Sequence, residues 1–175
     1  MIRSIFVLIF FFGMIVPCGA DEPKQAEVVK KNAEEISTAV LKGEYSKIVD
    51  LTYPKLVEMM GGREKMIMQT EESMKKMKEQ GITFSSNRVG QPGEVFTEQG
   101  NKFVVVPTTL ELKMPKGKLI AKSYLLGISS DGGQSWTFID GAGLAQKDKA
   151  EKLLPKLPAG LKLPERSKPD FVIDK

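Results

Sequence analysis

Three residues in this sequence have the chemistry that an interior site needs: Tyr53, Tyr124 and Asp140. A carboxylate shielded from water can take a proton from carbon, and a tyrosine hydroxyl can donate a hydrogen bond to the oxygen that then gains charge. Asp140 is therefore the candidate base, and Tyr53 or Tyr124 is the candidate donor. The structural alternative is that each tyrosine tethers the core by one hydrogen bond and that Asp140, before Gly141, caps a turn. We take the three as candidate ligand-binding residues and predict no catalytic residue.

The sequence lacks the residues that most other kinds of catalysis require. The sequence contains no histidine, which removes the commonest general base and the commonest metal ligand. It has no serine-hydrolase elbow, no phosphate-binding loop and no dinucleotide-binding glycine motif. The paired glutamates at residues 34–35 and 71–72 stand among lysines, as on solvated helix faces. We expect no metal and no cofactor, and the even mixture of 26 basic and 22 acidic residues argues against nucleic-acid binding.

Residues 1–20 have the layout of a secretory signal peptide. Arg3 precedes an apolar run over residues 5–16, and the small residues Cys18 and Ala20 mark a cleavage site. The run is shorter than the roughly 20 apolar residues of a membrane-spanning helix. We predict cleavage after Ala20 and export to the periplasm or the extracellular space. The alternative is a lipoprotein that touches the membrane through a lipidated Cys18, although Pro17 stands where a small residue is expected.

Residues 21–143 divide into a helical half and a strand half. Apolar residues recur every three or four positions over residues 26–40, and Gly43 ends this helix. Further helices are expected over residues 45–51, 54–60 and 63–80. The last helix carries an apolar stripe that we interpret as core filler rather than as an adaptable binding face: Met66, Ile67, Thr70, Met74 and Met77.

Alternating strands with hairpin turns follow the helices. The expected strands cover residues 82–90, 94–99, 102–114, 118–129 and 136–140. Helices followed by an antiparallel meander form an α+β pattern, with a curved sheet that carries helices on one face.

The turn before the last of these strands matches an Asp-box. Its residues are Ser129-Ser130-Asp131-Gly132-Gly133-Gln134-Ser135-Trp136. In such a turn the Asp caps backbone amides, the glycines take positive φ, and the Trp packs beneath. The motif occurs once, in a chain far too short for a propeller, so it predicts a hairpin and no glycosidase.

The strand over residues 102–114 is apolar on both faces. One face carries Val104, Val106, Thr108, Leu110, Leu112 and Met114, which we assign to the core. The other face carries Phe103, Val105 and Pro107, and a strand that is apolar on both sides is covered on both sides. Two covers are available: a homodimer through this outer face, which we favour slightly, or the chain's own residues 144–175.

Residues 144–175 form a Pro- and Leu-rich C-terminal arm. Four prolines prevent a long helix, so that only residues 146–154 are expected to form a short one. The segment is too rich in large apolar residues for a purely flexible tail. We predict an ordered, extended arm that packs on the body; a semi-rigid spacer is the alternative.

Two motifs carry a family resemblance. The first, Leu41-Lys42-Gly43-Glu44-Tyr45, is a glycine break after the first helix, and the second runs from Thr52-Tyr53-Pro54 to Gly61-Gly62. Together with the order of elements over residues 24–141, they resemble the nuclear transport factor 2-like (SnoaL-like) superfamily, and the second motif is similar to exported bacterial proteins of unknown function. The resemblance implies a cone-shaped curved antiparallel sheet with the N-terminal helices packed on its concave face. It also implies pairing of two cones through the outer sheet face.

The resemblance leaves two classes of function open. Ketosteroid isomerase-like and dehydratase-like members place Asp, His or Tyr inside the cone, whereas this chain has no His and no Asp within the inward-facing strand positions. We therefore favour an exported, non-enzymatic domain that binds a small apolar ligand or a protein partner. A small-molecule isomerase or dehydratase is the alternative.

Overall fold

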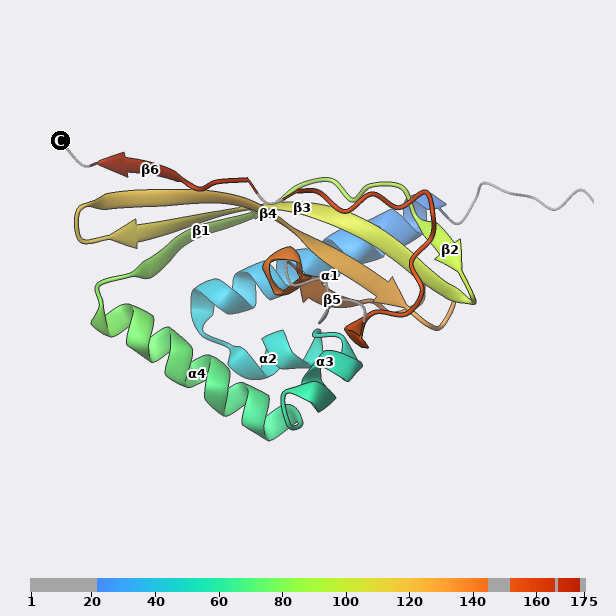
Figure 1. Ribbon diagram of the computed structural model, residues 1–175, viewed down its shortest axis with the longest axis horizontal. Helices are drawn as coiled ribbons and strands as arrows, with labels where there is room; N and C mark the ends of the chain where they lie inside the picture. The colour runs from blue at the N-terminus through green and yellow to red at the C-terminus, as the bar shows by residue number, and fades with distance from the viewer. Residues whose placement is uncertain (1–21, 145–151, 166, 174–175) are drawn as a thin grey trace, which may run out of the picture.

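The computed structural model describes residues 22–144, 152–165 and 167–173, which form an α+β fold with helices N-terminal to an open antiparallel sheet (Figure 1). The predicted signal peptide and Cys18 lie outside these residues. In the ranges described, no helix combines the length and apolar character needed to cross a membrane. The helices are α1 (Glu22–Lys42), α2 (Tyr45–Asp50), α3 (Pro54–Met59), α4 (Arg63–Glu79) and the 3₁₀ helix η1 (Gly141–Leu144). The strands are β1 (Thr83–Val89), β2 (Phe96–Glu98), β3 (Asn101–Met114), β4 (Gly117–Ser129), β5 (Thr137–Asp140) and β6 (Asp170–Ile173).

The helices begin and end close to the predicted positions, because glycine and proline determine their ends. Gly43 has φ +70° directly after α1, and Gly61 and Gly62 both have φ +94° between α3 and α4. Pro54 is the first residue of α3, where its missing N–H costs no helical hydrogen bond. The predicted helix over residues 146–154 falls largely on residues 145–151, outside the described part of the chain.

Strand β4 is a central strand of the sheet, in which the strands have the order β1-β3-β4-β5. On one side it pairs with β3 along its whole length, from Lys102↔Ser129 to Met114↔Gly117. On its other side β5 covers one end and β6 covers the other end. The sequence predicted all of these strands except β6, which lies within the C-terminal arm.

The first core cluster joins α1 to one face of the sheet. Along α1 the buried side chains of Val29, Ala33 and Ile36 recur on one stripe, as the helical spacing predicted. They pack against strand residues that are also buried: Val104, Val106, Leu125, Trp136 and Phe138.

The second core cluster lies on the opposite face, where the C-terminal arm covers the sheet. Tyr124, Leu126 and Ile128 alternate along β4 with Leu125 of the first cluster, so the two clusters use opposite faces. Phe103 is completely buried here. The arm contributes side chains to this cluster, and Figure 1 shows it running along the side of the sheet away from α1: Leu153, Leu154, Leu157, Leu161 and Leu163.

The arm confirms one prediction and corrects a detail of another. The predicted extended, packed arm is observed over residues 154–165 and 167–173, and it covers Phe103 and Val105 within a single chain. Pro107, which we expected to be covered as well, is exposed. Exposing this proline ring costs little free energy, and Pro107 has no backbone N–H that could be left without a partner.

The Asp131 turn between β4 and β5 has the predicted geometry. The Asp131 carboxylate accepts hydrogen bonds from the backbone N–H groups of Gln134 and Ser135, at 3.0 Å each, and from the hydroxyls of Ser129 and Ser135. Gly132 and Gly133 have positive φ. Trp136 is 1% exposed beneath the turn and donates to the Gly133 carbonyl. Local chemistry therefore fixes the β4–β5 connection.

This turn predicts a loss of stability in acid. Its hydrogen bonds, first of all from the Ser135 hydroxyl, hold the pKa of the Asp131 carboxyl well below its usual range. A carboxyl with a lowered folded-state pKa stabilises the fold above its unfolded pKa, and this contribution is lost as the pH falls below about 4. We expect Asp131→Asn to be less stable than the wild type at neutral pH, and the difference to shrink towards about pH 2. Urea unfolding across this pH range measures it, and a pH-independent difference would contradict the assignment.

Candidate functional site

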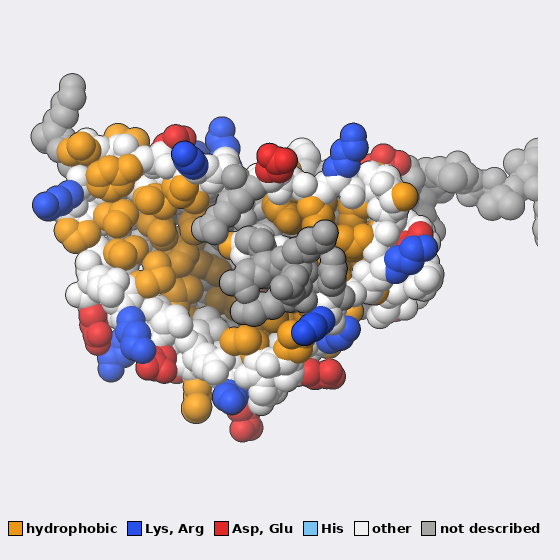
Figure 2. Space-filling model, in the orientation of Figure 1, with side chains coloured by type: hydrophobic (Ala, Val, Ile, Leu, Met, Phe, Trp, Pro, Cys, Tyr) orange, Lys and Arg blue, Asp and Glu red, His pale blue; other side chains and the backbone are white. Residues whose placement is uncertain are grey.

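An apolar cavity of about 880 Å³ is lined by α1, α4 and the inner face of the sheet, which is the face that packs on α1. It continues round the edge of β4, between β5 and β6, to η1 and the C-terminal arm. In Figure 2 hydrophobic side chains gather in a hollow at the left of the molecule, between the end of the β3–β4 hairpin and α4. The cavity exists because α4 packs on α2 and not on the sheet, which leaves space beneath the long hairpin. Its walls are mainly aliphatic and aromatic: Ile36, Val40, Met74, Phe84, Leu110, Leu112, Leu119, Leu125 and Phe138.

Uncharged polar side chains interrupt this lining, among them Ser37, Asn87, Thr108 and Ser123. Ser37 of α1 is buried and donates its hydroxyl hydrogen to the backbone carbonyl of Asn87, so its bonding capacity is partly used. Thr108 and Ser123 are register partners on β3 and β4. Within the described residues, neither of these two hydroxyls makes a hydrogen bond.

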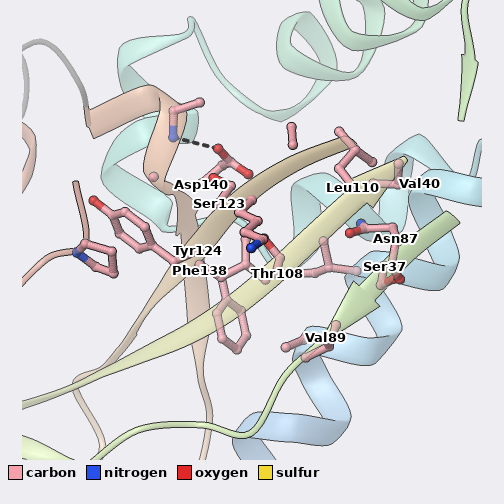
Figure 3. A pocket seen from close by; sticks show the side chains of 18 of the residues that line it. Ser37, Val40, Asn87, Val89, Thr108, Leu110, Ser123, Tyr124, Phe138 and Asp140 are labelled. Carbon is pink, nitrogen blue, oxygen red and sulfur yellow. Dashed lines mark hydrogen bonds between the residues drawn. The ribbon is translucent and has the colours of Figure 1, made fainter. Parts of the chain in front are cut away.

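The structure brings two of the three sequence-predicted residues into the cavity lining. Tyr124 and Asp140 both line it, from β4 and β5 (Figure 3). The Tyr124 ring packs against the backbone of Gly141, where an added Cβ would lie 2.4 Å from its Cε1 atom. Tyr53 is not among the described lining residues; its side chain belongs to the second core cluster, and its backbone N–H donates to Phe138.

Asp140 lies at the rim of the cavity, where its side chain caps the backbone of η1. Its Oδ1 atom accepts a hydrogen bond from the backbone N–H of Ala142 at 2.7 Å, which caps the first turn of η1 (Figure 3). The residue is exposed. This is the turn-capping role that the sequence offered as the alternative to a catalytic base.

The two tyrosines remain neutral hydrogen-bonding groups. Burial, and then the charge of Asp140, raise the pKa of Tyr124 above its ordinary value. Burial, and then the charge of Glu58, do the same to the pKa of Tyr53. A phenol whose pKa is raised keeps its proton through the neutral range, so Tyr124 can donate a hydrogen bond at the cavity wall.

Charge is confined to the rim. Among the described lining residues, charge is carried by Lys122, Asp140 and Glu165, and all three are exposed. The part of the chain that the structure describes contains no group of three Cys, Asp or Glu arranged to hold a metal ion. The arrangement can therefore surround an apolar molecule, but it supplies no positioned charge in the interior.

Sequence analysis did not identify the uncharged polar side chains in the cavity lining. Thr108 stands among apolar neighbours on one face of β3, between Val106 and Leu110. That interruption was a usable signal, since a hydroxyl on an otherwise apolar strand face needs a partner. Asn87 and Ser37 gave no such signal, because only the docking of α1 on β1 brings them together.

No protein-family model matches the chain, and no curated protein matches it.

Proposed function

We propose that the protein is an exported, non-enzymatic domain that binds a small apolar ligand in the cavity between α1, α4 and the sheet. The observation that carries the proposal is the cavity itself, about 880 Å³ in volume and lined mainly by apolar side chains. Its volume falls within the roughly 300–1,000 Å³ of typical small-molecule sites. Burying the apolar surface of a ligand there contributes roughly 25 cal/mol for each Å² removed from water.

We further propose that the fold is the cone of the nuclear transport factor 2-like superfamily, with α1 across the concave face of the sheet. Two observations support it: α1 packs on the inner face of β1, and the sheet carries core on both faces. In such a cone the ligand would occupy the open end, beneath the β3–β4 hairpin.

A cavity-filling variant tests the ligand proposal. Ala121 is half-buried on the inner face of β4, and Ala121→Trp would fill the space that the ligand needs. We expect the wild type to bind the apolar fluorescent probe phenylnaphthylamine, and Ala121→Trp to bind it at least about tenfold more weakly. Lys113→Trp is the matched control, because Lys113 is exposed on the same hairpin and does not line the cavity. Equal binding by all three proteins would refute the cavity as the site.

An isomerase or dehydratase of the ketosteroid isomerase-like type is the second candidate. The observation in its favour is that Tyr124 and Asp140 line the same cavity, and that the charge of Asp140 raises the pKa of Tyr124. The exposure of Asp140 and its role as a cap weigh against it. Proton exchange at carbon in a steroid ketone or an enone, abolished by Asp140→Asn, would establish this alternative.

Export rests on the pattern of residues 1–20. The charge at Arg3, the apolar run and the small residues at Cys18 and Ala20 support cleavage after Ala20. The intact mass of the protein isolated from its host should correspond to a chain that begins at Asp21. A diacylglyceryl group on Cys18 would instead establish a lipoprotein held at the membrane.

A further inference from the structure

We infer that the cavity binds a neutral single-chain lipid, such as a monoacylglycerol or a fatty alcohol, whose uncharged polar group is hydrogen-bonded by Thr108 and Ser123. The inference rests on the proposed function, because it specifies the ligand of the same cavity. It starts from polar side chains that line the cavity and that, within the described residues, make no hydrogen bond.

Thr108 is the central observation. Its side chain is 8% exposed and lines the cavity, and within the described residues its hydroxyl makes no hydrogen bond. The hydroxyl is therefore available at the cavity wall to donate and to accept a hydrogen bond. A polar group on a bound molecule is a suitable partner for it.

Thr108 is one of three polar side chains on neighbouring strands. Its register partner Ser123 lines the cavity from β4, and Asn87 lines it from β1, where it pairs with Leu110 (Figure 3). The Ser123 hydroxyl and the Asn87 side-chain amide likewise make no hydrogen bond to another described residue. Hydroxyl and amide groups both donate and accept, which suits a hydroxyl or ester on the ligand.

Apolar residues adjoin this polar group and define the rest of the ligand. Beyond Thr108 and Ser123, towards the hairpin end, the lining consists of large apolar side chains from β1, β3, β4 and α4: Phe84, Leu110, Leu112, Leu119 and Met74. These residues offer a surface for a hydrocarbon chain, with its polar group held at the row of Thr108 and Ser123.

The charges of the described lining residues lie at the rim of the cavity, so we expect the head group of the ligand to be neutral. The charged lining residues in the described chain, Lys122, Asp140 and Glu165, are all exposed at the rim. A carboxylate placed beside Thr108 would be desolvated with no cation to pair with it, which is costly in an apolar site. An alcohol or an ester carries no charge that must be desolvated, so the cavity should bind it more tightly than a fatty acid anion.

Competition against bound phenylnaphthylamine tests the head-group preference. We expect monolaurin and dodecanol to displace the probe at concentrations at least about tenfold lower than laurate at neutral pH. Displacement by laurate at equal or lower concentrations would overturn the inference and leave the proposed function intact. If the probe itself does not bind, the proposed function fails, and the inference fails with it.

Single substitutions test the role of Thr108. Thr108→Val keeps the shape of the side chain and removes the hydroxyl, so it should weaken monolaurin binding about 3- to 10-fold and should affect binding of the apolar probe less than binding of monolaurin. Thr108→Ser, which keeps a hydroxyl, should restore most of the affinity. Thr109→Val is the matched control, since Thr109 is the next residue on β3 and does not line the cavity. Equal weakening by Thr109→Val would overturn the assignment.

A stability measurement separates ligand binding from a structural role. In the ligand-free protein the Thr108 hydroxyl has no partner among the described residues, so Thr108→Val should keep or raise the melting temperature. A lower melting temperature, with weaker binding of probe and monolaurin alike, would show that the hydroxyl supports the fold and would overturn the inference.

Discussion

Deleting residues 156–175 is expected to lower the free energy of unfolding by about 3–5 kcal/mol and to make the protein self-associate. The deletion removes Leu157, Leu161 and Leu163, which pack on the second core cluster. It also uncovers Phe103 and Leu126, both completely buried in the intact chain. Urea unfolding and light scattering measure the two effects.

A shorter deletion provides the control. Removing residues 170–175 takes away β6, whose apolar residues Phe171, Val172 and Ile173 are all exposed, and keeps the leucines of the arm. We expect it to cost less than the longer deletion, because hydrogen bonds to one strand edge contribute less than buried leucines.

The same experiment tests whether a homodimer adds to the cover that the arm gives the outer face. A full-length monomer that associates only after truncation would identify the arm as the cover. The homodimer through this face stays a prediction, and it would be supported by a full-length dimer in which truncation changes neither mass nor stability.

Gly127→Ala is expected to destabilise the protein by about 2–3 kcal/mol, which lowers the melting temperature by roughly 5 °C or more. Gly127 is buried in β4 between its register partners Val104 and Phe138. An added Cβ would lie 2.8 Å from the Cγ1 atom of Val104 and 3.1 Å from the Cε1 atom of Phe138. Val104 is β-branched and completely buried, so it cannot move aside cheaply.

Gly143→Ala is the matched control for this substitution. Among the described residues, a Cβ at Gly143 would meet only the Cγ2 atom of Ile139, at 4.0 Å, which is an ordinary contact. Thermal unfolding should therefore separate Gly127→Ala from Gly143→Ala. The double variant Gly127→Ala/Val104→Ala should lose less stability than the sum of its parts, because Val104→Ala removes the clashing methyl group. Additive losses would contradict the packing explanation.

The features that were predictable from sequence are those that local chemistry fixes. The Asp131 turn depends on groups within a few residues of one another, and the helix ends depend on Gly43 and on the pair Gly61-Gly62. The alternation along β3 correctly indicated cover on both faces at Phe103 and Val105. Each of these inferences needs only backbone geometry and a period of two or 3.6 residues.

The candidate site was less predictable, because it depends on contacts between distant segments. Tyr53 and Tyr124 are indistinguishable by residue type, yet only Tyr124 is among the described lining residues. The difference arises because the chain at Tyr53 runs beside Phe138 of β5, a contact that no local pattern encodes. The cavity itself depends on α4 packing against α2 rather than against the sheet.

The position of α1 has a consequence for the kinetics of folding. The β3–β4 and β4–β5 hairpins close over short loops, at Met114↔Gly117 and Ile128↔Thr137, so the entropy lost in closing them is small. In the sequence, the helices α2, α3 and α4 and the strands β1 to β4 lie between Val29 of α1 and its contact Trp136, so this contact closes a long loop. We therefore expect α1 to dock after the rate-limiting barrier, and the cavity that it walls to form last. A ligand that needs this cavity would slow unfolding while leaving the rate of folding unchanged.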